Sequence, residues 1–162
     1  MQSTLPPAIK PIRHKSVVIS ASHLQYFRTK KERDMQSVHL MGEGYEPHVD
    51  QEGGKLVYSL PVDSGFITYE FAFEIKREDL DVLLTDNYRR AVLEITAHTV
   101  LQHSTLKGND RLTQRDFDNL VADTLHSTPE FLQSFISQIS HDHHIGIEGY
   151  AQNIMARRSL AK

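Results

Sequence analysis

The segment Phe66–Ile75 constrains the fold more than any other part of the chain. Every second position holds a large apolar side chain: Ile67, Tyr69, Phe71, Phe73 and Ile75. Successive side chains of a strand point to opposite faces of a sheet, so this period of two predicts a strand. We expect its aromatic face to pack on helices, and its other face to expose Glu70 and Glu74 to water.

Further strand signals lie on the N-terminal side of this segment. Apolar or β-branched runs at 17–19, 38–41 and 56–60, and a weaker run at 24–27, predict additional strands. Glycines at 42, 44, 53 and 54 indicate turns between them, and residues 63–65 indicate the next turn. Three prolines precede this region, so we expect residues 1–15 to form an N-terminal arm and residues 16–162 to form one domain.

After Lys76 the pattern becomes helical. Apolar residues recur three and four positions apart from Leu80 to Leu101, and Thr85-Asp86 can cap or restart a helix there. This segment is apolar over so much of its surface that it is expected at the centre of the molecule. Thr113 with Asp116 resembles a capping box, and Thr128-Pro129 fits an N-cap followed by the first helical residue.

A last helix is expected at about 147–158, with Tyr150, Ile154 and Met155 facing inward. Strands followed by helices predict the α+β class, with an N-terminal, mostly antiparallel sheet and a C-terminal cluster of about four helices.

Composition excludes several classes of function. The 162 residues contain no cysteine, which rules out disulfides, thiolate zinc sites and cysteine nucleophiles. No apolar run approaches the roughly 18 residues that a membrane-spanning helix needs, and no signal peptide is apparent, so a cytoplasmic protein is expected. No G-x-S-x-G elbow or phosphate-binding glycine loop is present. We expect no cofactor and no enzymatic activity.

The charge is distributed unevenly along the chain. Residues 1–34 carry seven Lys or Arg against two Asp or Glu, residues 35–86 carry three against eleven, and residues 87–162 carry eight against eight. The sheet region is therefore strongly acidic. Such a surface is either ordinary solvated surface or a docking site for a basic partner. The carboxylates assigned to that partner site are Asp50, Glu52, Asp63, Glu70, Glu74, Glu78 and Asp79.

Two other groups of residues suggest chemistry. His141, His143 and His144 are weak candidates for metal ligands, because adjacent residues rarely converge on one ion and a distant ligand such as His98, His103 or His126 would be needed. We expect this segment to be a polar loop; a small metal-dependent hydrolase is the alternative. Glu94 and His98 share a helix face and could act as base and orienter, although a histidine there is more often structural.

The basic cluster at residues 28–33 is interrupted by Glu32, and we interpret it as a solvated hairpin or a lysine-protected edge strand. Direct nucleic-acid binding is the less favoured interpretation, with the cluster contacting phosphates.

The strand Phe71–Ile75 running into a helix at Glu78-Asp79-Leu80, in an acidic α+β chain without cysteine, resembles bacterial immunity proteins. These are the small inhibitors paired with contact-dependent or polymorphic toxins. The similarity covers about residues 69–125, in the order of strand and helices and in the style of the helix at 88–98. It implies a cytoplasmic protein that binds one cognate toxin domain, nucleases among the candidates, and covers its active site. It carries over no individual residues, since specificity surfaces differ between relatives.

Overall fold

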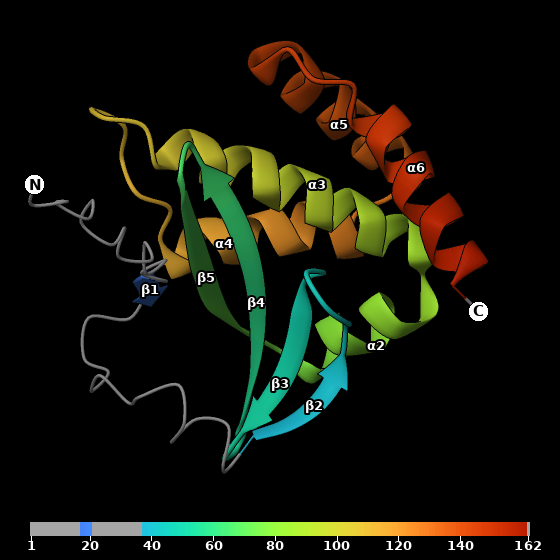
Figure 1. Ribbon diagram of the computed structural model, residues 1–162. Coiled ribbons are helices and arrows are strands. Elements are labelled where there is room, and N and C mark those ends of the chain that lie inside the picture. Colours follow the sequence, from blue (N-terminus) through green and yellow to red (C-terminus); the bar gives the residue numbers. More distant parts are fainter. Residues whose placement is uncertain (1–16, 21–36, 162) are drawn as a thin grey trace, which may run out of the picture.

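The computed structural model describes residues 17–20 and 37–161 of the chain, with side chains for the second range (Figure 1). The strands are β1 (Val17–Ser20), β2 (Ser37–Met41), β3 (His48–Glu52), β4 (Lys55–Ser64) and β5 (Ile67–Ile75). The helices are α2 (Arg77–Thr85), α3 (Asn87–Ser104), α4 (Gln114–Val121), the π-helical turn η1 (Ala122–His126), α5 (Pro129–His143) and α6 (Ile147–Leu160). The expected α+β class is therefore confirmed. The proposed N-terminal arm, the candidate strand at 24–27 and the basic cluster at 28–33 lie outside the described residues.

The five strands form one sheet in the order β1-β5-β4-β3-β2. β1 pairs with β5 in parallel, and the other neighbours are antiparallel. The turn between β4 and β5 consists of Gly65 and Phe66, so residues 63 and 64 belong to β4 rather than to the expected turn. β3 was not expected from the sequence, because four of its five residues are polar. Val49, its one apolar residue, is buried.

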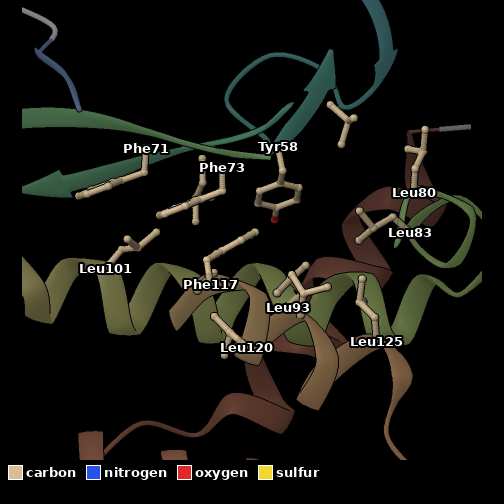
Figure 2. Close-up of a cluster of buried hydrophobic side chains, with 14 of the residues drawn as sticks. Tyr58, Phe71, Phe73, Leu80, Leu83, Leu93, Leu101, Phe117, Leu120 and Leu125 are labelled. Carbon is tan, nitrogen blue, oxygen red and sulfur yellow. The ribbon is translucent and has the colours of Figure 1, made fainter. Parts of the chain in front are cut away.

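The main core lies between the sheet and the helices that follow it (Figure 2). Phe71 and Phe73 of β5 are buried, as the alternating pattern predicts, and Phe73 stacks on Phe117 of α4 with ring centroids 4.2 Å apart. Tyr58 of β4 points into the same cluster, where its ring lies 5.6 Å from that of Phe117. Burial of these aromatic side chains fixes which face of the sheet the helices cover.

α3 lies between two cores, as its apolar surface predicts. Leu93, Ala97 and Leu101 face the main core, whereas Ala91 and Val92 belong to a second cluster formed with α5 and α6. In Figure 1 the sheet and the α5–α6 pair lie on opposite sides of α3. This second cluster also contains Leu132, Ile136, Ile147, Ala151 and Ile154.

The expected helix starts are confirmed by side-chain caps. Thr113 and Asp116 form a reciprocal capping box at α4, and the Thr128 hydroxyl accepts a bond from the Phe131 N–H ahead of Pro129. Asp86 separates α2 from α3 by accepting a bond from the Arg89 N–H. Each cap satisfies an N–H group that the helix itself leaves without an acceptor.

Two expectations for the C-terminal part were wrong. The histidine-rich segment is not a loop: α5 continues through His143, and His144 ends it in the left-handed conformation with φ 53°. Tyr150 does not face inward, since 51% of it is exposed, and Ile147 and Ala151 are the buried residues at the start of α6.

Candidate functional site

One face of the sheet carries most of the acidic residues expected to bind a partner. On β3, β4 and β5 the buried side chains alternate with residues that point away from the helices. Asp50, Glu52, Glu70 and Glu74 all occupy these alternate positions. We call these four residues the carboxylate face. They come from strands that lie in one sheet on either side of β4, so the backbone holds them in fixed relative positions.

Histidines are interleaved with the carboxylates at one end of this face. His39 Nδ1 lies 2.8 Å from Asp50 Oδ1, and His48 Nε2 lies 3.5 Å from Asp50 Oδ2 and 3.9 Å from Glu70 Oε1. The pairing His39↔Asp50 between β2 and β3 places the first two side chains directly opposite each other. A bulge after His39 then lets both Leu40 and Met41 turn towards the core.

The hydrogen bond that Asp50 accepts from His39 raises the pKa of His39, and the bond to the Gly42 carbonyl oxygen adds to that effect. Both partners are acceptors, so they favour the imidazolium form, which donates from both ring nitrogens. When His39 is protonated, it partly offsets the negative charge of Asp50. The Lys55 amine pairs with Glu74 Oε1 on the same face and offsets part of its charge, so the remaining negative charge is greatest at Glu52 and Glu70.

The other expected acidic residues lie elsewhere. Asp63 also occupies an alternate position, but it lies near the end of β4, beyond the part that β3 pairs with, and its Oδ1 accepts a bond from the Thr68 hydroxyl at 2.6 Å. Glu78 is exposed on α2 and lies 3.6 Å from the Lys76 amine. Asp79 is 6% exposed, and its two oxygens bind the Lys76 N–H and His126 Nε2. Asp79 therefore stabilises the start of α2 and its contact with η1, and it does not belong to an exposed docking surface.

A groove of about 420 Å³ opens beside the end of β4. Glu94 and His98, which the sequence places on one face of α3, both line it, together with Asp63. The structure does not join Glu94 and His98 as a base and its orienter. Glu94 Oε2 instead binds Arg158 Nη2 at 2.5 Å, and burial raises the pKa of Glu94. Burial lowers the pKa of His98, which favours its neutral form.

Behind the groove, Glu94 belongs to a network of four charged residues. Arg158 of α6 also contacts Glu46 at 3.3 Å, and Arg90 of α3 contacts the other oxygen of Glu46 at 3.4 Å. Burial lowers the pKa of Arg90, and the neighbouring Arg158 lowers it further. The two arginines and two glutamates balance in charge. The sequence alone does not reveal this network, because its members are up to 112 residues apart.

The histidine-rich end of α5 does approach one distant histidine. The rings of His103 and His143 meet edge to face, with centroids 5.2 Å apart. His141 instead lies beside Asp142, at 3.3 Å. Within residues 17–20 and 37–161, no group of three or more histidine or acidic side chains is arranged to hold a metal ion. The pair His103–His143 alone does not make the three-ligand site of a catalytic metal centre.

Comparisons of the chain with protein-family models, with curated proteins and with solved structures found no match. None of the helices in the described part of the chain combines the length and the apolar character needed to cross a membrane.

Proposed function

We propose that this chain is an immunity protein, a non-enzymatic inhibitor that binds a basic toxin domain in the cytoplasm. The observation that carries the proposal is the carboxylate face: Asp50, Glu52, Glu70 and Glu74 alternate with the buried residues that face the helices. Because strands fix the backbone positions of these carboxylates, only their side chains must become ordered when they meet cationic side chains. The resemblance of the strand-then-helices order to immunity proteins supports the same interpretation.

Inhibition would follow from competition for the toxin's cationic residues. A toxin that acts on nucleic acid holds phosphates with lysine and arginine. Carboxylates on the face would bind the same side chains and exclude the substrate. Long-range attraction between the two surfaces would also raise the association rate, by about 10- to 1000-fold over a neutral pair at low salt.

The test uses the toxin encoded beside the gene for this chain, because immunity proteins and their toxins are encoded as neighbours. Co-expression of the chain should restore growth of cells that produce the toxin. The double variant Glu70→Lys with Glu74→Lys should lose this protection and slow association several-fold at low salt. Glu78→Lys is the control, because it changes an exposed acidic residue on α2, away from the face.

The two outcomes that would contradict the proposal are distinct. Full protection by the double variant would exclude the carboxylate face as the docking surface. Failure of the unmodified chain to protect against, or bind, its neighbouring toxin would exclude the immunity function. Circular dichroism of each variant would establish that it remains folded before either conclusion is drawn.

The alternative of a metal-dependent hydrolase gains little from the geometry. His103 and His143 are in contact, but His141 and His144 do not join them in a three-ligand arrangement within the described residues.

A further inference from the structure

The groove beside β4 exists because the sheet is incomplete there. β3 begins at His48, which pairs with Ser59 of β4, so β4 residues 60–64 have no β3 partner. Pro61 lies in this unpaired stretch and has no N–H group to offer a neighbouring strand. The loop at 42–47 passes this end of the sheet and contributes Tyr45 and Pro47 to the groove, and α3 contributes Glu94, Ile95 and His98. The groove is therefore built by the strand, the loop and the central helix.

The polar groups that line the groove select for a cation. Asp63 and Glu94 are both carboxylates, and none of the nine lining residues is lysine or arginine. Because Arg158 and Arg90 balance the charges of Glu94 and Glu46, Asp63 supplies the excess negative charge of the groove. One oxygen of each carboxylate already has a partner, Thr68 for Asp63 and Arg158 for Glu94. Among the described residues, neither second oxygen has a hydrogen-bond partner, so each can accept a bond from a ligand. His98 is favoured in its neutral form and does not oppose a cation.

The apolar part of the lining suits a long side chain. Leu60, Pro61 and Ile95 contribute aliphatic surface to the same groove. Tyr45 stands at the rim with 96% of its surface exposed. Exposed aromatic side chains at a rim are frequent anchors of protein interfaces, and their ring faces attract cations.

We propose that this groove receives one arginine side chain of the toxin partner, an inference that rests on the proposed function and identifies the contact that makes docking specific. The arginine stem lies along the aliphatic wall, and its guanidinium group donates to the carboxylates of Asp63 and Glu94. Arginine fits better than lysine, because its planar fork can reach two acceptors that come from different elements. Tyr45 covers the bound guanidinium from the rim.

The test is an NMR titration of the full chain with N-acetyl-arginine-N-methylamide. Its matched control is the citrulline analogue, which keeps the shape of the side chain but carries no charge. The arginine compound should cause saturable shifts at Tyr45, Asp63 and His98, and citrulline should not. Asp63→Asn and Tyr45→Ala should each weaken binding about fivefold, as expected for the loss of one partly exposed contact. Glu78→Gln removes an exposed carboxylate on α2, outside both the groove and the carboxylate face, and should leave binding unchanged.

Equal shifts with citrulline, shifts confined to residues outside the groove, or unchanged affinity in Asp63→Asn would overturn this inference. The results also test the arginine site and the immunity function separately. If the groove fails this test while the variant at Glu70 and Glu74 still loses protection, the arginine site is wrong and the immunity function stands. If arginine binds in the groove but the chain gives no protection against its neighbouring toxin, the site stands and the immunity function is wrong.

Discussion

His39 and His98 show how position in this fold changes the charge of the same side chain. His39 lies on the surface between Asp50 and the Gly42 carbonyl oxygen, and both acceptors favour its protonated form. His98 lies in the groove on α3, where burial disfavours the protonated form. At a pH between the two pKa values, His39 therefore adds a positive charge to the carboxylate face, whereas His98 leaves the groove without one.

The ring resonances of the two histidines should titrate on opposite sides of 6.5, the ordinary value of the pKa. We expect His39 above it and His98 below it. Stabilisation from the His39–Asp50 contact is complete below pH 6.5 and is lost as the pH rises through the folded-state pKa of His39. Stabilisation from neutral His98 is complete above pH 6.5 and is lost as the pH falls through its folded-state pKa.

NMR titration of the unmodified chain and of Asp50→Asn checks these shifts. In the variant the pKa of His39 should fall towards its ordinary value, because its largest cause has been removed, and that of His98 should not change. A pKa of His39 that stays raised in Asp50→Asn would show that the Asp50 contact is not its cause.

At the scale of elements, the sequence predicts what depends on local pattern. The alternation in β5 and the caps at Asp86, Thr113 and Thr128 are properties of neighbouring residues, and the structure confirms all of them. β3 was not predicted because it forms a strand through its pairing with β2 and β4, and its own residues are mostly polar. The groove was not predicted for the same reason, since it forms where the pairing of β3 with β4 stops.

The end of α5 at His143 was also predicted wrongly from the local sequence. Polar histidines suggested a loop, but α5 extends through them and places the His143 ring against His103. Likewise, the partner site predicted from the sequence grouped Asp79 with the acidic residues of the sheet as one surface. Asp79 departs from it because its carboxylate caps α2 and binds His126, contacts that sequence spacing alone did not identify.

The loop between β2 and β3 depends on Gly42. This residue has φ +94°, and a Cβ atom on it would lie 2.3 Å from the Pro47 carbonyl oxygen. Gly42→Ala should destabilise the fold by about 2–4 kcal/mol, because it adds a backbone collision to the strain of a positive φ. Gly44→Ala is the matched control: φ is +62°, but nothing lies within 4 Å, so the cost should be about 1 kcal/mol.

Urea unfolding of both glycine variants measures the difference. Equal destabilisation by the two substitutions would mean that the close approach at Pro47 does not constrain the loop. The result also bears on the groove, because the same loop carries Tyr45 and Pro47 on its wall.

At the scale of the whole molecule, two hydrophobic cores share α3, and one ion network joins them. Arg158 of α6 binds Glu94 of α3 and Glu46 of the loop between β2 and β3. It therefore connects the C-terminal helix pair to the sheet side of the protein. Arg158 Nη1 is buried without a hydrogen-bond partner among the described residues, so the network is not fully satisfied. The stability of the α6 contact thus depends on balanced charge as well as on apolar burial.

Arg158→Met should lower the free energy of unfolding by about 2–3 kcal/mol, because it leaves Glu94 partly buried without its cation. This lies below the usual range for breaking a buried pair, since the two side chains remain 14% and 16% exposed. Arg157→Met, at the exposed neighbouring position of α6, should change stability by less than about 0.5 kcal/mol. Combining Arg158→Met with Glu94→Gln should recover about 1 kcal/mol, because the amide is less costly to bury than the carboxylate.

Urea unfolding gives these differences, and amide hydrogen exchange locates them. Exchange in α6 should accelerate in Arg158→Met more than exchange in β4 and β5, because the network holds α6 against α3 while the main core stays intact. Equal stability of the Arg158 and Arg157 variants would contradict a connecting role for the network. Uniform acceleration across the sheet and α6 would mean that the two cores open as one unit, with α3 rather than Arg158 as the connection that matters.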